Sequence, residues 1–289
     1  MGYKLKNTIL LSDLASQLDL EFKGADIEIK GVSSFNNLAS NELSFTKEIS
    51  ETVAKVGLIV HKNIDIDAAD SQGFIFSDNP RLDFIRALAF LESNIGFATY
   101  DFPSEIHPSV RIGKNVVIED GCNISEGVIL EHNVVIHAGT KIGKNSRVRS
   151  CSSIGGDGFG FERLDDGTPL RFPHLGGVLI GENVEIGSCT AIARGTLSNT
   201  LIDDYVKIDN LVHIAHNVHL KKGAFIIACA EISGGVVVGE NAWIAPNSCT
   251  HQKITIGDNA LIGLGAVVTK NVPNNTVYAG NPAKKIRDI

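Results

Sequence analysis

Aromatic residues are scarce in this chain. They make up 6% of its 289 residues, and there is a single Trp and a single Met. A core with so few rings has to be filled by Ile, Val, Leu and Ala, which suits many short, similar strands better than helix packing. Glycine is instead abundant, at 29 residues, against a typical share of ~7%.

The signatures of several protein classes are also missing. Segment 1–19 has no basic stretch leading into a long apolar run, so it does not resemble a secretory signal. No run approaches the ~18 consecutive apolar residues of a membrane span. The 26 basic and 33 acidic residues leave a net charge of −7, which argues against a nucleic-acid binder. We therefore expect a cytoplasmic protein with no nucleic-acid partner and no membrane span.

Motifs of metal, redox and nucleophilic chemistry are lacking as well. No two of the five cysteines form a CxxC pair, so we expect small buried residues at Cys122, Cys151, Cys189, Cys229 and Cys249. There is no Walker motif and no nucleophile elbow, so the sequence gives no support to phosphoryl transfer or serine hydrolysis.

The first part of the chain, 1–102, has mixed patterns that predict a small α/β domain. Residues 13–20 are typical of a short helix, and 56–60 and 73–76 of strands. Asn79 and Pro80 predict a turn that leads into a helix over 81–91. One face of that helix is expected to hold the apolar residues Leu82, Ile85, Leu88, Ala89 and Phe90.

From residue 103 onward the sequence repeats every six residues. Aliphatic residues stand at every sixth position from 106 to 154 and resume at 180, 186 and 192. After a four-residue insertion the series continues from 202 to 268, with Thr250 as a weak member. A strand alternates every two residues and a helix repeats near 3.6, so a period of six fits a strand-and-corner unit. About 24 such hexads, three to a coil, predict a parallel β-helix of about eight coils over 103–273.

Two segments lie outside this repeat. Residues 155–178 leave the solenoid through a glycine-rich stretch, and loops of this kind commonly carry function. Residues 274–289 are expected to form a C-terminal tail.

Three motifs carry a resemblance to a known family. They are DGFGF at 157–161, GENVEIGSCTAIARG at 181–195 and IDNLVHIAHNV at 208–218. They resemble the hexapeptide-repeat acyltransferases and, among these, the UDP-3-O-acylglucosamine N-acyltransferases of lipid A biosynthesis. SDNPRL at 77–82 is similar to the end of that family's uridine-binding domain. The resemblance implies a left-handed β-helix, a homotrimer and a nucleotide-sugar acceptor.

The chain departs from that family at several points. Ala193 stands where the family usually has Asp, and TKEISE at 46–51 supplies neither the Asn nor the Tyr expected near a uracil. The usual C-terminal helix is not expected. Segment 263–287 is instead similar to the ending of coenzyme-A-dependent sugar acetyltransferases.

The resemblance therefore implies an N-acyltransferase that moves an acyl group from a thioester to an amino sugar linked to a nucleotide. It implies no permanently bound cofactor, and the donor is acyl-CoA or an acyl carrier protein. The few apolar outward positions of the last hexads favour a short acyl group on coenzyme A. The alternatives are the lipid A enzyme proper with its hydroxyacyl carrier protein, an O-acyltransferase, and a non-catalytic scaffold or carbonic-anhydrase-like metal protein.

The predicted catalytic residues are histidine and aspartate. His216 holds the family's catalytic position, and a neutral imidazole suits removal of the amine proton. Asp209 is expected to orient its ring, on the same coil or across a subunit boundary. His251 matches a second family histidine, which would bind the thioester carbonyl or the pantetheine arm. His213 and His219 are six residues apart, a spacing that argues against a shared metal.

The remaining site residues are predicted contacts to substrates. Those expected to contact the acceptor are Asn210, Asp157, Phe159, Phe161 and Phe45, the last by stacking on a nucleobase. Those expected to contact the donor are Gly263, Gly265, Lys284, Lys285 and Arg287, of which the last three are suited to its phosphates or to an acidic carrier protein.

Overall fold

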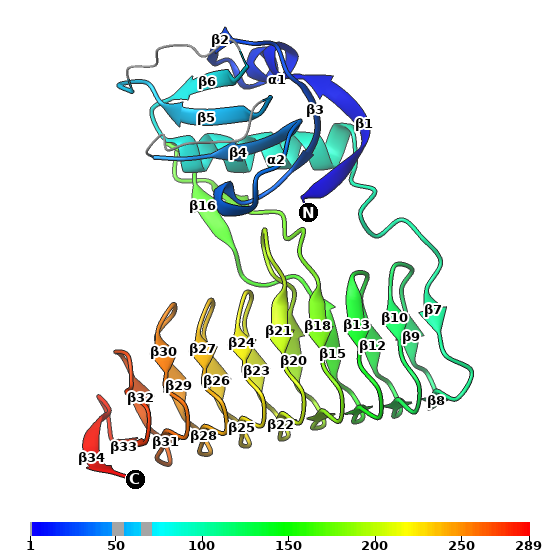
Figure 1. Ribbon diagram of the computed structural model, residues 1–289, viewed down its shortest axis with the longest axis vertical. Coiled ribbons are helices and arrows are strands. Elements are labelled where there is room, and N and C mark those ends of the chain that lie inside the picture. The colour runs from blue at the N-terminus through cyan, green and yellow to red at the C-terminus, as the bar shows by residue number, and fades with distance from the viewer. Residues whose placement is uncertain (1, 48–54, 65–70) are drawn as a thin grey trace. The chain divides into compact units, whose positions relative to one another are not determined.

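The computed structural model describes residues 2–47, 55–64 and 71–289 (Figure 1). The chain forms two compact units, Met1–Thr99 with Gly160–His174, and Tyr100–Phe159 with Leu175–Ile289. Most of the segment expected as a loop of the solenoid thus belongs to the first unit. Within the described ranges no helix is long and apolar enough to cross a membrane.

The first unit is a six-stranded sheet with two helices. The strand order is β1-β3-β4-β5-β6-β2, parallel from β3 to β6 and antiparallel at both ends. The elements are β1 (Tyr3–Leu10), α1 (Leu11–Leu18), β2 (Glu21–Gly24), β3 (Glu28–Val32), the short 3-10 helix Phe35–Asn37, β4 (Glu42–Phe45), β5 (Gly57–His61), β6 (Gly73–Ser77) and α2 (Pro80–Asn94). Residues 160–174 add the hairpin β16 (Phe161–Arg163) and β17 (Pro169–Arg171), which the sequence did not predict.

Helix α2 begins at Pro80, one residue before the predicted start, and ends at Asn94, three residues past the predicted end. The side chain of Asn79 accepts a hydrogen bond from the amide of Leu82, and Pro80 occupies the first turn. The predicted apolar face is only partly right, because Ala89 and Phe90 are half-buried. The buried face also includes Phe84, Ala87 and Leu91.

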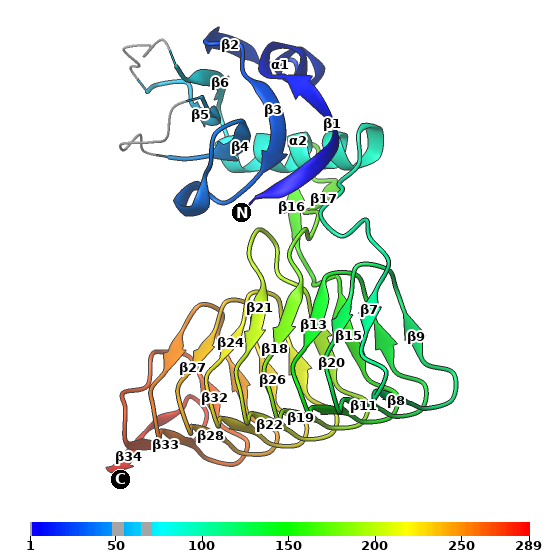
Figure 2. The ribbon, with the colours of Figure 1, turned by 45° about the vertical axis from the view of Figure 1, so that its right-hand side comes forward.

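The second unit is a left-handed parallel β-helix, as predicted. Figure 2 shows its coils as stacked rungs, with one strand of each coil on each of three faces. Face 1 contains β7 (Glu105–Ile106), β10 (Asn123–Ile124), β13 (Thr140–Ile142), β18 (Val178–Ile180), β21 (Thr200–Ile202), β24 (His219–Leu220), β27 (Val237–Val238) and β30 (Thr255–Ile256).

Face 2 contains β8 (Arg111–Ile112), β11 (Ile129–Leu130), β14 (Arg147–Val148), β19 (Glu185–Ile186), β22 (Lys207–Ile208), β25 (Phe225–Ile226), β28 (Trp243–Ile244), β31 (Leu261–Ile262), β33 (Thr276–Ala279) and β34 (Lys284–Asp288). Face 3 contains β9 (Val117–Ile118), β12 (Val135–Ile136), β15 (Ser153–Gly156), β20 (Ala191–Ala193), β23 (His213–Ile214), β26 (Glu231–Ile232), β29 (Cys249–Thr250) and β32 (Val267–Val268). Faces 1 and 3 have eight strands each, so the solenoid has eight coils.

The last residues extend the solenoid. Strand β33 pairs in parallel with β31, and β34 turns back antiparallel along β33. The segment expected as a tail is therefore largely a hairpin on face 2. Two edges of the prism are named here: edge A, where face 3 turns into face 1, and edge B, where face 2 turns into face 3.

The aliphatic residue of each hexad points into the prism. Those of the inner coils are almost fully buried and form one continuous column. The first coil differs, because Ile106 and Ile112 remain 40% and 51% exposed. Coils two to eight thus contribute most of the apolar burial that stabilises the solenoid.

The corners require left-handed backbone. Many are occupied by Asn with positive φ, which tolerates this conformation better than most residues. Cys151, Cys189 and Cys229 occupy equivalent corners on edge B, also at positive φ, and their side chains are exposed. The expectation of buried cysteines is therefore wrong for these three and right for Cys122.

Ile226→Ala is expected to lower the free energy of unfolding by about 2–5 kcal/mol, because it leaves a cavity in the column. The matched change Ile112→Ala, at the same hexad position on the exposed first coil, should cost less than about 1 kcal/mol. Urea unfolding followed by circular dichroism measures both. Equal losses of unfolding free energy in the two variants would contradict the claim that the first coil is less buried than the inner coils.

Candidate active site on edge A

Edge A collects most of the chain's irregular features. Each strand of face 3 is followed there by a corner, and the excursion after β15 and the insertion Arg194–Asn199 after β20 both leave the solenoid at this edge. His216 follows β23 one coil further on, and His251 follows β29. Two coils separate these histidines, which is about 10 Å at ~4.8 Å per coil.

The ring of His216 is held in one tautomer. Its Nδ1 lies 3.0 Å from the side-chain oxygen of Asn217. The amide nitrogen of Asn217 donates to the carbonyl of Ser198 at 3.0 Å, which fixes the orientation of the amide. Because an amide oxygen only accepts, Nδ1 of His216 carries the hydrogen. The lone pair of the neutral ring is then on Nε2, as a general base requires.

Asn217 also anchors the insertion. Its oxygen accepts from the amide and hydroxyl of Thr196, at 3.2 and 2.9 Å. In the sequence, Asn217 is only one member of the motif at 208–218. Its position directly after the histidine, at a corner with φ of 60°, is the signal that could have identified it.

The ring of His216 lies over Gly234, one coil further along edge A. A Cβ at Gly234 would stand 2.8 Å from Cε1 and 2.9 Å from Nε2 of that ring. Such contacts are too short for any side chain. Glycine at this position therefore lets the imidazole lie against the backbone of the next coil.

His251 is exposed at the same edge. Its Nδ1 lies 3.0 Å from the backbone carbonyl of Gln252. A carbonyl only accepts, so Nδ1 carries the hydrogen here too. The neutral ring can then accept through Nε2 but cannot donate to a thioester carbonyl.

Within one folded subunit, Asp209 and Asn210 do not lie beside His216. They follow β22 and lie at edge B, whereas His216 lies at edge A, with β23 between them. A carboxylate oxygen of Asp209 accepts from the amide of Asn210 at 2.8 Å. The side chain of Asn210 accepts from the amide of Ser188 at 2.7 Å. Counting the corners along the hexads would have placed Asp209 and His216 on different edges of the prism.

The aromatic residues expected at the acceptor are distributed over both units. In the solenoid unit, Asp157 is exposed and Phe159 is 89% exposed. In the first unit, the guanidinium of Arg171 lies 5.0 Å from the ring centre of Phe161. Also there, the ring of Phe45 packs at 5.0 Å on that of Phe84. Residues 48–51 of the TKEISE stretch lie outside the described residues.

The residues expected at the donor lie at the far end of the solenoid. Gly263 and Gly265 form the edge B corner after β31, and a Cβ at Gly263 would stand 2.8 Å from that of Ala279. Strand β34 contains the basic residues Lys284, Lys285 and Arg287, all exposed. Lys285 forms a 2.7 Å ion pair with Asp288, and Arg287 donates to the carbonyl of the same residue.

Arg194 also lies at edge A, although its sequence pattern predicts no role for it. Its Nε donates to the carbonyl of Gly176 at 2.8 Å, Nη2 donates to the carbonyl of Ala138, and its guanidinium lies 5.6 Å from the ring centre of Tyr100. Burial raises the pKa of Tyr100, and the positive charge of Arg194 lowers it by a smaller amount. Arg194 thus ties the end of the excursion to an earlier corner of edge A.

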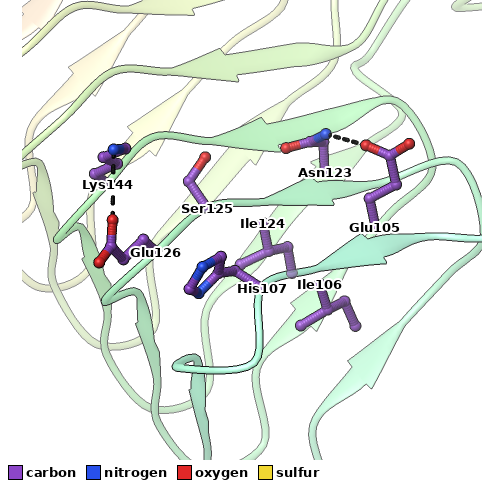
Figure 3. Close-up of a pocket in the computed structure, with 8 residues that line it drawn as sticks. All are labelled: Glu105, Ile106, His107, Asn123, Ile124, Ser125, Glu126 and Lys144. Carbon is purple, nitrogen blue, oxygen red and sulfur yellow. Dashed lines mark hydrogen bonds and ion pairs between the residues drawn. The ribbon is translucent and has the colours of Figure 1, made fainter.

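Two hollows lie away from edge A. One, of about 480 Å³, is on face 1 beside the first coils and is lined by His107 together with ion-paired Glu126 and Lys144 (Figure 3). The other, of about 290 Å³, lies beside Asp209 and includes Lys207, Phe225 and Trp243. Among the described residues no three His, Cys, Asp or Glu side chains cluster as a metal site would require.

Comparison with known proteins gives relatives over nearly the whole chain. A UDP-3-O-acylglucosamine N-acyltransferase of Campylobacter lari is 33% identical, over 96% of this chain and 94% of its own. The enzyme of that name from Campylobacter concisus is 32% identical, over 93% and 92%. No family model matches the sequence.

Among solved structures, LpxA from Acinetobacter baumannii matches 63% of this chain and 71% of its own, with a TM-score of 0.56 and 24% identity. A UDP-N-acetylglucosamine acyltransferase matches 63% and 70%, with a TM-score of 0.53 and 24% identity. These structures support the β-helix fold. The curated relatives confirm the acyltransferase class expected from the motifs and do not favour a scaffold or a carbonic anhydrase. The chain belongs to the UDP-3-O-acylglucosamine N-acyltransferase family.

Proposed function

We propose that this enzyme transfers an acyl group from a thioester to the amine of UDP-3-O-acylglucosamine, with His216 as general base. The names of its relatives supply the acceptor class. The observation that carries the catalytic assignment is the tautomer of His216, set by its 3.0 Å contact to Asn217.

The reaction needs one proton removed and one returned. As the amine nitrogen attacks the thioester carbonyl, Nε2 of His216 takes a proton from that nitrogen. Collapse of the tetrahedral intermediate breaks the carbon–sulfur bond, and the imidazolium returns the proton to the departing thiolate. The products are an amide and a free thiol. Nδ1 keeps its hydrogen and donates it in the hydrogen bond to Asn217 throughout the reaction, so the ring does not need to turn.

His251 acts on the donor in this proposal. Its Nδ1 donates to the carbonyl of Gln252, so the neutral ring accepts from an amide N–H of the pantetheine arm.

The donor is a short acyl group on coenzyme A. The exposed positions around the last coils include Lys253, Asn259 and Thr269, which do not form the apolar channel that a long chain requires. The basic residues Lys284, Lys285 and Arg287 contact the donor phosphates.

The first unit binds the nucleotide, with Phe45 against the nucleobase. Phe159 and Phe161 remain predicted contacts of the acceptor. The solenoids assemble as a homotrimer about an axis parallel to their own. Such an axis keeps equivalent coils at the same height. Asp209 and His216 belong to one coil, so edge B of one subunit brings Asp209 and Asn210 level with His216 of the next. Asp209 then contacts the acceptor instead of orienting the histidine.

His216→Ala is expected to lower kcat by at least ~10²-fold, because the general base is lost. Gly234→Ala should also lower kcat, at least ~10-fold, because the new Cβ displaces the ring. Both variants should keep a melting temperature close to that of the unaltered enzyme. The assay measures amide formation, with His213→Ala as the control. Near-normal kcat in His216→Ala would assign the base to another residue.

Mixing two inactive variants tests the shared site. His216→Ala and Asp209→Asn are each expected to be impaired. Random trimers from equal amounts should regain about one quarter of the sites, because each intact site takes one residue from each neighbour. Light scattering should show a trimer. An active monomer, or no recovery after denaturation and reassembly of the mixture, would contradict the arrangement.

Competition between donors tests acyl length. We expect a higher kcat/KM with acetyl- or hydroxybutyryl-CoA than with hydroxymyristoyl acyl carrier protein, on one amino-sugar nucleotide. The Lys284→Gln, Lys285→Gln double variant should raise KM for the CoA donor, because phosphate contacts are lost. A much higher kcat/KM with the long-chain carrier protein would refute the short-chain donor.

A further inference from the structure

Three side chains from successive coils form a chain of hydrogen bonds at the start of edge A. Glu119 follows β9, His137 follows β12 and Ser153 begins β15. Nδ1 of His137 lies 3.0 Å from Oε1 of Glu119, and Nε2 lies 3.2 Å from the hydroxyl of Ser153. Carboxylate, imidazole and hydroxyl thus stand in the order that activates a serine nucleophile.

The protons are arranged as such a nucleophile requires. Burial favours the neutral form of Glu119, but hydrogen bonds from the amide of Ala138 and from His137, with the charge of Arg194, lower the pKa of its carboxyl below the usual value. The carboxylate only accepts, so Nδ1 of His137 carries the hydrogen. Nε2 then accepts from the hydroxyl of Ser153.

The serine is accessible, and the side chain of its neighbour Ile154 points into the core. Ser153 and His137 are both partly exposed. Gly155 and Gly156 come after Ile154, and Gly155 has a φ of +89°. The vacant Cβ position of Gly156 is 3.4 Å from Nε2 of His137 and 3.8 Å from the serine hydroxyl. Gly155 is buried and Gly156 is partly exposed, so an acyl carbonyl can approach the hydroxyl past Gly156.

We propose that Ser153, His137 and Glu119 form a second reactive site, which hydrolyses activated acyl groups such as esters or thioesters. Ser153 lies two coils from His216, about 10 Å at ~4.8 Å per coil, because β15 pairs with β20 and β20 with β23. The second site does not depend on the N-acylation proposed above, because none of its residues takes part in that reaction.

The reaction balances with water as the second substrate. The serine oxygen attacks the acyl carbonyl while Nε2 of His137 takes the hydroxyl proton. The bond to the thiolate or alkoxide then breaks, and the imidazolium protonates that group. Water, deprotonated by His137, attacks the acyl-serine, and the serine leaves with the proton. The products are a carboxylic acid and a thiol or alcohol, with no oxidation or reduction.

Covalent labelling and hydrolysis test the site on the full chain without any sugar nucleotide. A fluorophosphonate probe should form an adduct on Ser153, located by mass spectrometry of the digested protein. Hydrolysis of 4-nitrophenyl acetate tests the ester arm, and release of free thiol from acetyl-CoA tests the thioester arm. Ser153→Ala should lower kcat/KM at least ~10²-fold on the accepted substrate, and Glu119→Gln and His137→Gln at least ~10-fold.

The matched control is His219→Gln, which removes a histidine–carboxylate pair of the same 3.0 Å length, to Asp203 on face 1. It should leave labelling and hydrolysis unchanged. An adduct on Ser153 that His137→Gln prevents and His219→Gln does not would support the site. No adduct on Ser153 of the unaltered protein, or equal labelling of the His137 and His219 variants, would overturn it. Amide formation, assayed on the same preparations, reports separately on His216.

Discussion

The stacking of coils in register is the constraint on which the rest of the molecule depends. Each inward aliphatic side chain pairs with its equivalent one coil away, as Ile208 does with Ile226 and Ile226 with Ile244. A slip by one residue would turn this column outward. The same register places equivalent corners above one another. Residues about eighteen positions apart, such as His216 and Gly234, therefore become direct neighbours.

This geometry makes an edge of the prism a place to assemble chemistry. A corner supplies one or two outward side chains, too few for a site on its own. Stacked corners give a line of groups about 4.8 Å apart, and the excursion and the insertion widen that line at edge A. The backbone hydrogen bonds of the coils hold it rigid. Preorganised groups of this kind require little rearrangement during reaction.

Periodicity alone was enough to predict the solenoid, its parallel strands and its number of coils. It could not predict the hairpin of β16 and β17, because that segment lies outside the repeat and packs with the first unit. The expectation of buried cysteines failed at three corners: Cys151, for example, has a left-handed backbone and an exposed thiol. His216 was found through a motif, whereas its tautomer depends on which way the side-chain amide of Asn217 points, and the sequence does not reveal that orientation. The sequence did not predict the cluster of Glu119, His137 and Ser153. These residues lie on successive coils and become neighbours only when the coils stack.

The central claim is that His216 presents an unprotonated Nε2 to the acceptor amine. Nitrogen-15 NMR of histidine-labelled enzyme near neutral pH tests it directly, with the signal assigned by its loss in a His216 variant. The arrangement with Asn217 predicts a protonated, pyrrole-type shift for Nδ1 and an unprotonated, pyridine-type shift for Nε2. The reverse pattern, or a ring doubly protonated at neutral pH, would contradict the assignment of His216 as the base.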